Sequence, residues 1–105
     1  MTVKEIGQFV HAIDPKARHY FVGQEGSNFT VWMETERLAL EADDGWAEEG
    51  WKATIARFTK QEYDPIAASI EAALLNNVRI ALTSYKVGSH LQSGYISHFF
   101  EFEAM

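Results

Sequence analysis

One helix with complete start and stop signals lies between two strand patterns in the second half of the chain. Asp64 is a preferred N-cap residue, and Pro65 suits the first position of a helix. Asn76-Asn77 marks the end of the segment. Between these signals, apolar residues recur with the 3.6-residue period of a helix at Ile66, Ala67, Ile70, Ala73 and Leu74. A helix set between β-rich segments favours a layer of helix on sheet.

The N-terminal segment also has the pattern of an amphipathic helix. Thr2 is placed to cap it, and Glu5, three residues later, completes a capping-box pattern. Asp14-Pro15 is expected to end the helix, because a residue before proline avoids the helical conformation. The apolar stripe consists of Val3, Ile6, Phe9, Val10 and Ile13.

The remaining segments have strand patterns. Strands are predicted at 19–22, 29–33, 51–60, 78–85 and 95–103, with a polar loop at 88–94 and a solvated turn at 43–50. Residues 35–40 either continue the second strand or bend into an arm. Alternation places Phe29, Val31 and Met33 on one face, and Thr30 and Trp32 on the other.

Alternation also assigns faces in two later segments. In 51–60, one face holds Trp51, Ala53, Ile55 and Arg57, and the other holds Thr54, Ala56 and Phe58. In 95–103, the inward face holds Ile96, His98, Phe100 and Phe102, whereas Ser97, Glu101 and Glu103 look outward.

These segments predict a single α+β domain over residues 1–105. Its order is helix, three strands, helix, two strands. Two helices pack on one face of a mostly antiparallel or mixed sheet of four to five strands, because this arrangement buries the apolar stripes.

Composition narrows the environment and the partners. The 105 residues include no cysteine, so neither disulfides nor thiolate zinc ligands stabilise the fold, and a reducing compartment suits it. No apolar run resembles a secretory signal or a membrane span, so we expect neither export by that route nor membrane insertion. The net charge of −6 disfavours nucleic-acid binding, because phosphate contacts need a basic surface.

No motif in the sequence predicts catalysis, a cofactor or a metal. The four histidines are unpaired, and His98 with Glu101 is the one weak candidate pair. Two residues three apart on a strand face opposite sides, which separates this pair. Asp43-Asp44-Gly45 lacks the ligand spacing of a calcium loop. We therefore expect a protein that is not an enzyme.

An acidic segment is the candidate for protein contacts. Between positions 34 and 49 it contains seven acids and one base, and Trp46 lies within it. Tryptophan is enriched at interface hot spots. We expect this segment to meet basic residues of a neighbouring copy, among them Lys52, Arg79 and Lys86. The predicted interface residues are Glu34, Glu36, Arg37, Asp43, Asp44, Trp46, Glu48, Glu49, Arg57 and Lys60.

A set of short segments is distinctive when taken together: 28–32 (NFTVW), 37–40 (RLAL), 43–45 (DDG), 50–51 (GW), 57–60 (RFTK), 63–67 (YDPIA) and 94–103 (GYISHFFEFE). Together these segments resemble those of the small tail-completion or tail-terminator proteins of phages and prophages. The resemblance implies an α+β subunit of a ring, typically a hexamer, that caps the tail tube and joins it to the head. It further implies tail-tube and head-completion proteins as partners, with assembly in the bacterial cytoplasm and a final place in the virion tail.

Two other functions stay open. One is a small adaptor or inhibitor module that binds a protein through a sheet edge and the Trp46 loop. The other is a small-molecule-binding or hydrolytic domain that uses His98 and Glu101.

Overall fold

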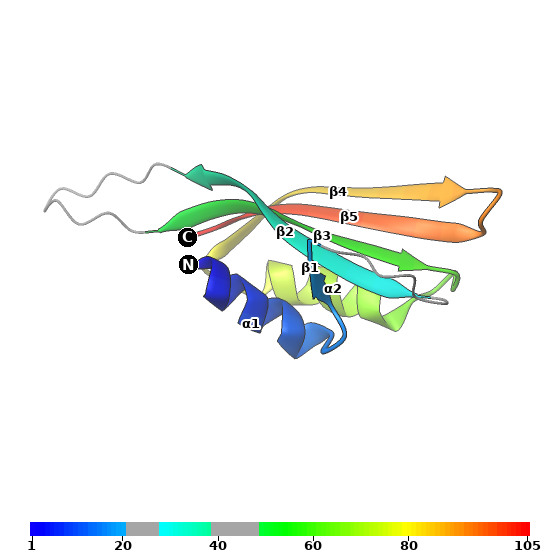
Figure 1. The fold of residues 1–105 in the computed structure, drawn as a ribbon, viewed down its shortest axis with the longest axis horizontal. Coiled ribbons are helices and arrows are strands. Elements are labelled where there is room, and N and C mark those ends of the chain that lie inside the picture. Colours follow the sequence, from blue (N-terminus) through cyan, green and yellow to red (C-terminus); the bar gives the residue numbers. More distant parts are fainter. Residues whose placement is uncertain (21–27, 39–48) are drawn as a thin grey trace, which may run out of the picture.

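A computed structural model of the chain describes residues 1–20, 28–38 and 49–105. Its elements follow in the order α1 (Val3–Ile13), β1 (Arg18–His19), β2 (Phe29–Leu38), β3 (Gly50–Thr59), α2 (Pro65–Leu75), β4 (Ile80–His90) and β5 (Tyr95–Ala104) (Figure 1). This order confirms the predicted α+β arrangement.

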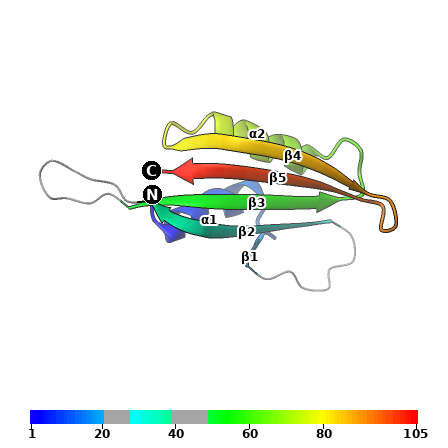
Figure 2. The ribbon, with the colours of Figure 1, turned by 90° about the horizontal axis from the view of Figure 1, so that it is seen from above.

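The strands form one mixed sheet with the order β1-β2-β3-β5-β4 (Figure 2). The short β1 runs parallel to β2, and the other neighbouring strands are antiparallel. Both helices lie on the same side of the sheet (Figure 1). The predicted two-layer architecture is therefore confirmed.

Local signals at the helix ends act as the sequence predicts. The Thr2 hydroxyl accepts a hydrogen bond from the Glu5 backbone N–H at 3.1 Å, and the Glu5 carboxylate accepts one from the Thr2 N–H at 3.0 Å. Asp14 forms the C-cap of α1, and the Asp64 carboxylate caps α2 by accepting from the Ala67 N–H at 3.2 Å.

The core lies between the helices and the inner face of the sheet. Gly7 faces Trp32 so closely that a Cβ there would lie 3.0 Å from the indole ring, so the close approach of α1 to β2 favours glycine at this position. The most deeply buried side chains include Ile6, Val10, Ile55, Ile70, Leu74, Phe100 and Phe102.

The structure corrects three predicted boundaries. The first strand ends at His19, because Tyr20 has a φ of 64°, which is not extended backbone; positions 21 and 22 lie outside the described residues. The second strand continues to Leu38 with a bulge between Glu34 and Glu36, which resolves the alternative left open for positions 35–38.

The predicted loop at 88–94 is shorter than expected. β4 continues to His90 because Gly88 pairs with Ser97 and His90 pairs with Tyr95 in an antiparallel hairpin. At the other predicted turn, 43–50, the described part is Glu49 and Gly50, and Gly50 already belongs to β3.

Candidate interaction surface

The sheet has a second face, which no described helix covers (Figure 1). We call this outer side the open face. The register shows which residues share it, since Val31, Ala56, Phe99 and Lys86 lie directly opposite one another across β2, β3, β5 and β4. Val31 and Ala56 are each 5% exposed, so the middle of the open face is apolar and close-packed.

Four aromatic side chains dominate one half of the open face. Phe29 stacks on Phe58 with ring centroids 4.7 Å apart, and Phe58 meets Phe99 edge to face at 5.7 Å. Tyr95 completes the group with an edge contact to Phe29 at 5.9 Å. Phe99 is 37% exposed. An aromatic cluster of this kind, partly in solvent, is typical of a protein-binding surface.

The open face also carries charged side chains. Near the aromatic cluster lie two bases: Lys60, whose ammonium is 4.9 Å from the centroid of the Tyr95 ring, and the exposed Lys86. Further along β5 the face carries Glu101 and Glu103, and Lys52 on β3 lies opposite Glu103. The aromatic half of the open face therefore has a basic border.

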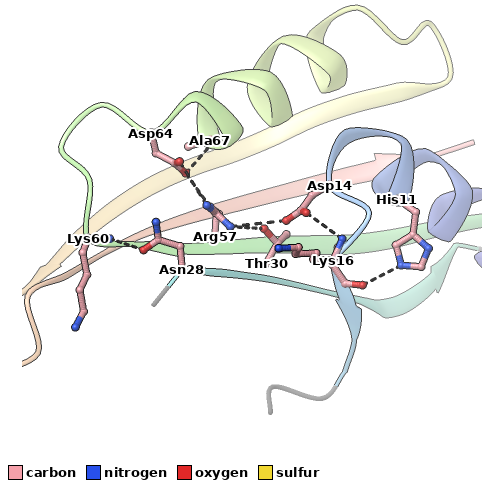
Figure 3. Close-up of polar contacts among 10 residues, drawn as sticks. His11, Asp14, Lys16, Asn28, Thr30, Arg57, Lys60, Asp64 and Ala67 are labelled. Atoms are coloured by element: carbon pink, nitrogen blue, oxygen red, sulfur yellow. Dashed lines mark hydrogen bonds and ion pairs between the residues drawn. The ribbon is translucent and has the colours of Figure 1, made fainter. Parts of the chain in front are cut away.

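The inner face contains a buried ionic network (Figure 3). Arg57 on β3 donates from Nε to the Asp64 carboxylate at 2.7 Å and from Nη1 to the Thr30 hydroxyl at 3.2 Å. The same Nη1 lies 3.7 Å from Asp14. Arg57 thus links the C-cap of α1 and the N-cap of α2 to the sheet.

This network explains the ionisation of Asp64. Burial raises the pKa of the Asp64 carboxyl, but the hydrogen bond and charge of Arg57, together with the backbone N–H groups of Ala67 and Ile66, outweigh burial and hold the pKa below its ordinary 3.8. The carboxylate also caps α2, so both of its functions are structural.

His98 and Glu101, the weak catalytic candidates, do not converge. His98 lies beneath the helices at 8% exposure, where its Nδ1 shares a 2.7 Å hydrogen bond with the Tyr85 hydroxyl. Glu101 lies opposite Thr54 on the open face. The alternation argument against a shared site is therefore confirmed.

The predicted interface residues on β2 contact other parts of the same chain. Glu34 lies 2.6 Å from the His19 ring and also hydrogen-bonds the Tyr20 hydroxyl. Glu36 pairs with Lys52 at 3.3 Å, and Arg37 lies 5.7 Å from the centre of the Trp51 ring.

The other predicted interface residues are scattered. The Glu49 carboxylate accepts from the Trp51 indole at 2.8 Å, and Lys60 lies on the open face. Arg57 does not fit the predicted interface, because it is only 4% exposed and its donors are directed into the core. Asp43, Asp44, Trp46 and Glu48 lie outside the described residues.

The open face was not predicted as a surface from the sequence. Alternation placed Phe29 and Phe58 correctly, but it did not assign Phe99 and Tyr95 to the same side. The signal in the sequence was the alternation along β5. Phe99 lies two residues from both Ser97 and Glu101, so it points to the same outward side as they do.

Comparisons with known proteins give no family assignment. No protein-family model matches the chain. No curated protein matches it either. Among the described residues, no helix is long and apolar enough to cross a membrane.

We predict that the burial of His98 makes the stability of the fold depend on pH. Burial lowers the pKa of His98 from its ordinary 6.5; Asp64 partly offsets this, and Arg57 adds to it. Below about pH 6.5 the unfolded chain therefore binds a proton that the folded chain resists, so stability falls with decreasing pH, by at most about 1.4 kcal/mol per pH unit for one group. Above that range the stability due to this group is fully present.

Urea unfolding of the wild type and of His98→Phe at pH 7.5 and 5.5 measures this effect. The phenyl ring keeps the stack on Phe100 and removes the titration. We expect a smaller loss at pH 5.5 in the variant than in the wild type. Equal losses in both proteins would contradict the assignment to His98.

Proposed function

We propose that the protein is a structural subunit that acts by self-association, as a tail-terminator-like ring that caps a phage or prophage tail tube and joins it to the head. The observation that supports this most is the open face, where Phe29, Phe58, Tyr95 and Phe99 form an aromatic surface that no described helix covers. A surface of this kind is costly to leave in water and suits a permanent protein contact.

The buried polar groups agree with a structural role. Arg57, Asp14 and Asp64 are committed to joining the two helices to the sheet, and His98 bonds Tyr85 within the same layer. On this proposal the chain works stoichiometrically, needs no cofactor, assembles in the bacterial cytoplasm and remains in the virion tail.

A controlled tube-assembly experiment tests the proposal. The chain is mixed with the tail-tube protein encoded in the same genome, and the products are measured by native mass spectrometry and by electron microscopy of tube length. We expect a closed ring of fixed copy number, alone or on tube ends, and shorter tubes as the amount of the chain rises. A chain that stays monomeric with the tube protein and leaves tube length unchanged would refute the proposal.

The alternative, an adaptor that binds a partner strand, depends on the outer edge of β4. That strand is eleven residues long and lies at the end of the sheet. It has a bulge between Leu82 and Ser84 and an exposed Lys86, two features that discourage the addition of a further strand. The open face is therefore the stronger candidate for contact.

A further inference from the structure

A second surface lies on the opposite side of the molecule, along the outer side of α2. Ala67, Ile70 and Leu74 bury the inner side of this helix. The exposed residues of the helix are Pro65, Ala68, Ser69, Ala72 and Leu75, and Leu75 is 65% exposed. Soluble helices ordinarily have charged residues on the solvent side, so this outer side of α2 is unusually apolar.

The charges around α2 have one sign. Residues 61–77 contain Glu62, Asp64 and Glu71 and no lysine or arginine. Asp64 pairs with Arg57 in the core, whereas Glu62 is exposed just before α2 and Glu71 is half-buried on the flank of α2 that is near Tyr85 of β4. Neither of these two glutamates forms an ion pair with another residue in the described ranges.

The two surfaces differ in the size of their side chains and in the sign of the charges near them. The open face presents large aromatic rings with Lys60 and Lys86 at its border, whereas α2 presents mainly small side chains, with Glu62 just before its start and Glu71 on one flank. Small residues let a helix approach a neighbouring surface closely, and interface cores are rich in aromatic residues and poor in charge. Opposite charges at the rim favour one orientation of docking.

We infer that the open face of one copy of this chain binds the outer side of α2 of the next copy. The two surfaces lie on opposite sides of the sheet, so one chain cannot satisfy both by itself (Figure 1). A contact between two different surfaces repeats from copy to copy and closes into a ring when the rotation permits. This inference rests on the proposed function and specifies which surfaces form the ring.

Cysteine crosslinking tests this pairing, because the chain contains no cysteine of its own. Lys86→Cys and Ala72→Cys are both at exposed positions, one on the open face and one on the outer side of α2. With a short bismaleimide, the double variant should give a ladder of dimers, trimers and larger products up to the ring size. Each single variant should give no product beyond the background of the cysteine-free chain.

The possible outcomes separate this inference from the proposed function. Efficient dimers from Lys86→Cys alone would indicate that two open faces pack on each other, and would overturn the inference. A ring seen by native mass spectrometry without a ladder would also overturn it, while leaving the proposed function intact. If no oligomer forms with or without the tube protein, both fail.

Charge reversal gives a second, independent readout. The Lys60→Glu/Lys86→Glu pair should weaken ring formation at least about tenfold, because like charges then meet across the contact. Adding Glu62→Lys/Glu71→Lys should restore assembly to within about threefold of the wild type. Lys4→Glu, at an exposed position on α1, is the matched control and should leave assembly unchanged. Failure of the four-residue variant to recover would count against the pairing.

Discussion

Replacing Arg57 by leucine is expected to lower the free energy of unfolding by about 3–5 kcal/mol, because it leaves buried carboxylates without their partner. The Asp64 side chain is 1% exposed and that of Asp14 is 7% exposed, so water does not replace the guanidinium. Arg57 also holds the ends of both helices against the sheet. The loss is therefore expected to loosen the packing of α1 and α2 as well as the charge network.

Chemical denaturation of the monomer at neutral pH measures this loss. Lys52→Gln is the matched control, since it breaks the Glu36–Lys52 pair, in which both side chains are about half exposed. Exposed pairs of this kind contribute at most about 1 kcal/mol. If Arg57→Leu costs no more than Lys52→Gln, the buried network does not hold the helices as proposed.

The helices were predictable because their signals are local. The capping box joins Thr2 to Glu5, three residues further on, and Asp64 caps a backbone N–H three residues away. Propensity and capping act within one turn of chain, so no knowledge of the tertiary fold is needed. The order of the elements along the chain and the two-layer fold followed from the same periodicities.

The end of β4 could not be predicted in this way, because a strand ends where its partner stops pairing. Ser89 and His90 look like loop residues by composition, yet they pair with Ile96 and Tyr95. Such pairing is decided by the geometry of the hairpin and is not visible in the polarity of the segment.

The environment of Arg57 was likewise hidden in the sequence. A lone arginine on a strand is ordinarily at the surface. Its partners Thr30, Asp14 and Asp64 belong to three other segments of the chain, so no local pattern shows that they meet. The open face was missed for a related reason. Alternation identifies two sides of a strand, but β2 and β3 have apolar residues on both, so the pattern does not show which side the helices cover.

Two adjacent phenylalanines separate folding from assembly. Phe100 is fully buried under the helices, and Phe99 lies on the open face at 37% exposure. Phe100→Ala is expected to cost about 3–5 kcal/mol in unfolding free energy, because it leaves a cavity in the core. Phe99→Ser is expected to cost about 1–2 kcal/mol, because its ring is only partly removed from water and loses one edge contact to Phe58.

The order of effects reverses for self-association. Phe99→Ser removes an aromatic ring from the proposed contact, so the ring should be lost at protein concentrations where the variant remains folded. Phe100→Ala should impair assembly only through its unfolded fraction, and lowering the temperature or adding a stabilising osmolyte should restore the ring. Circular dichroism and native mass spectrometry on the same samples measure folding and assembly separately. The two residues are neighbours in sequence and face opposite sides of the sheet. If both variants lost folding and assembly in parallel, the open face would have no role of its own in assembly.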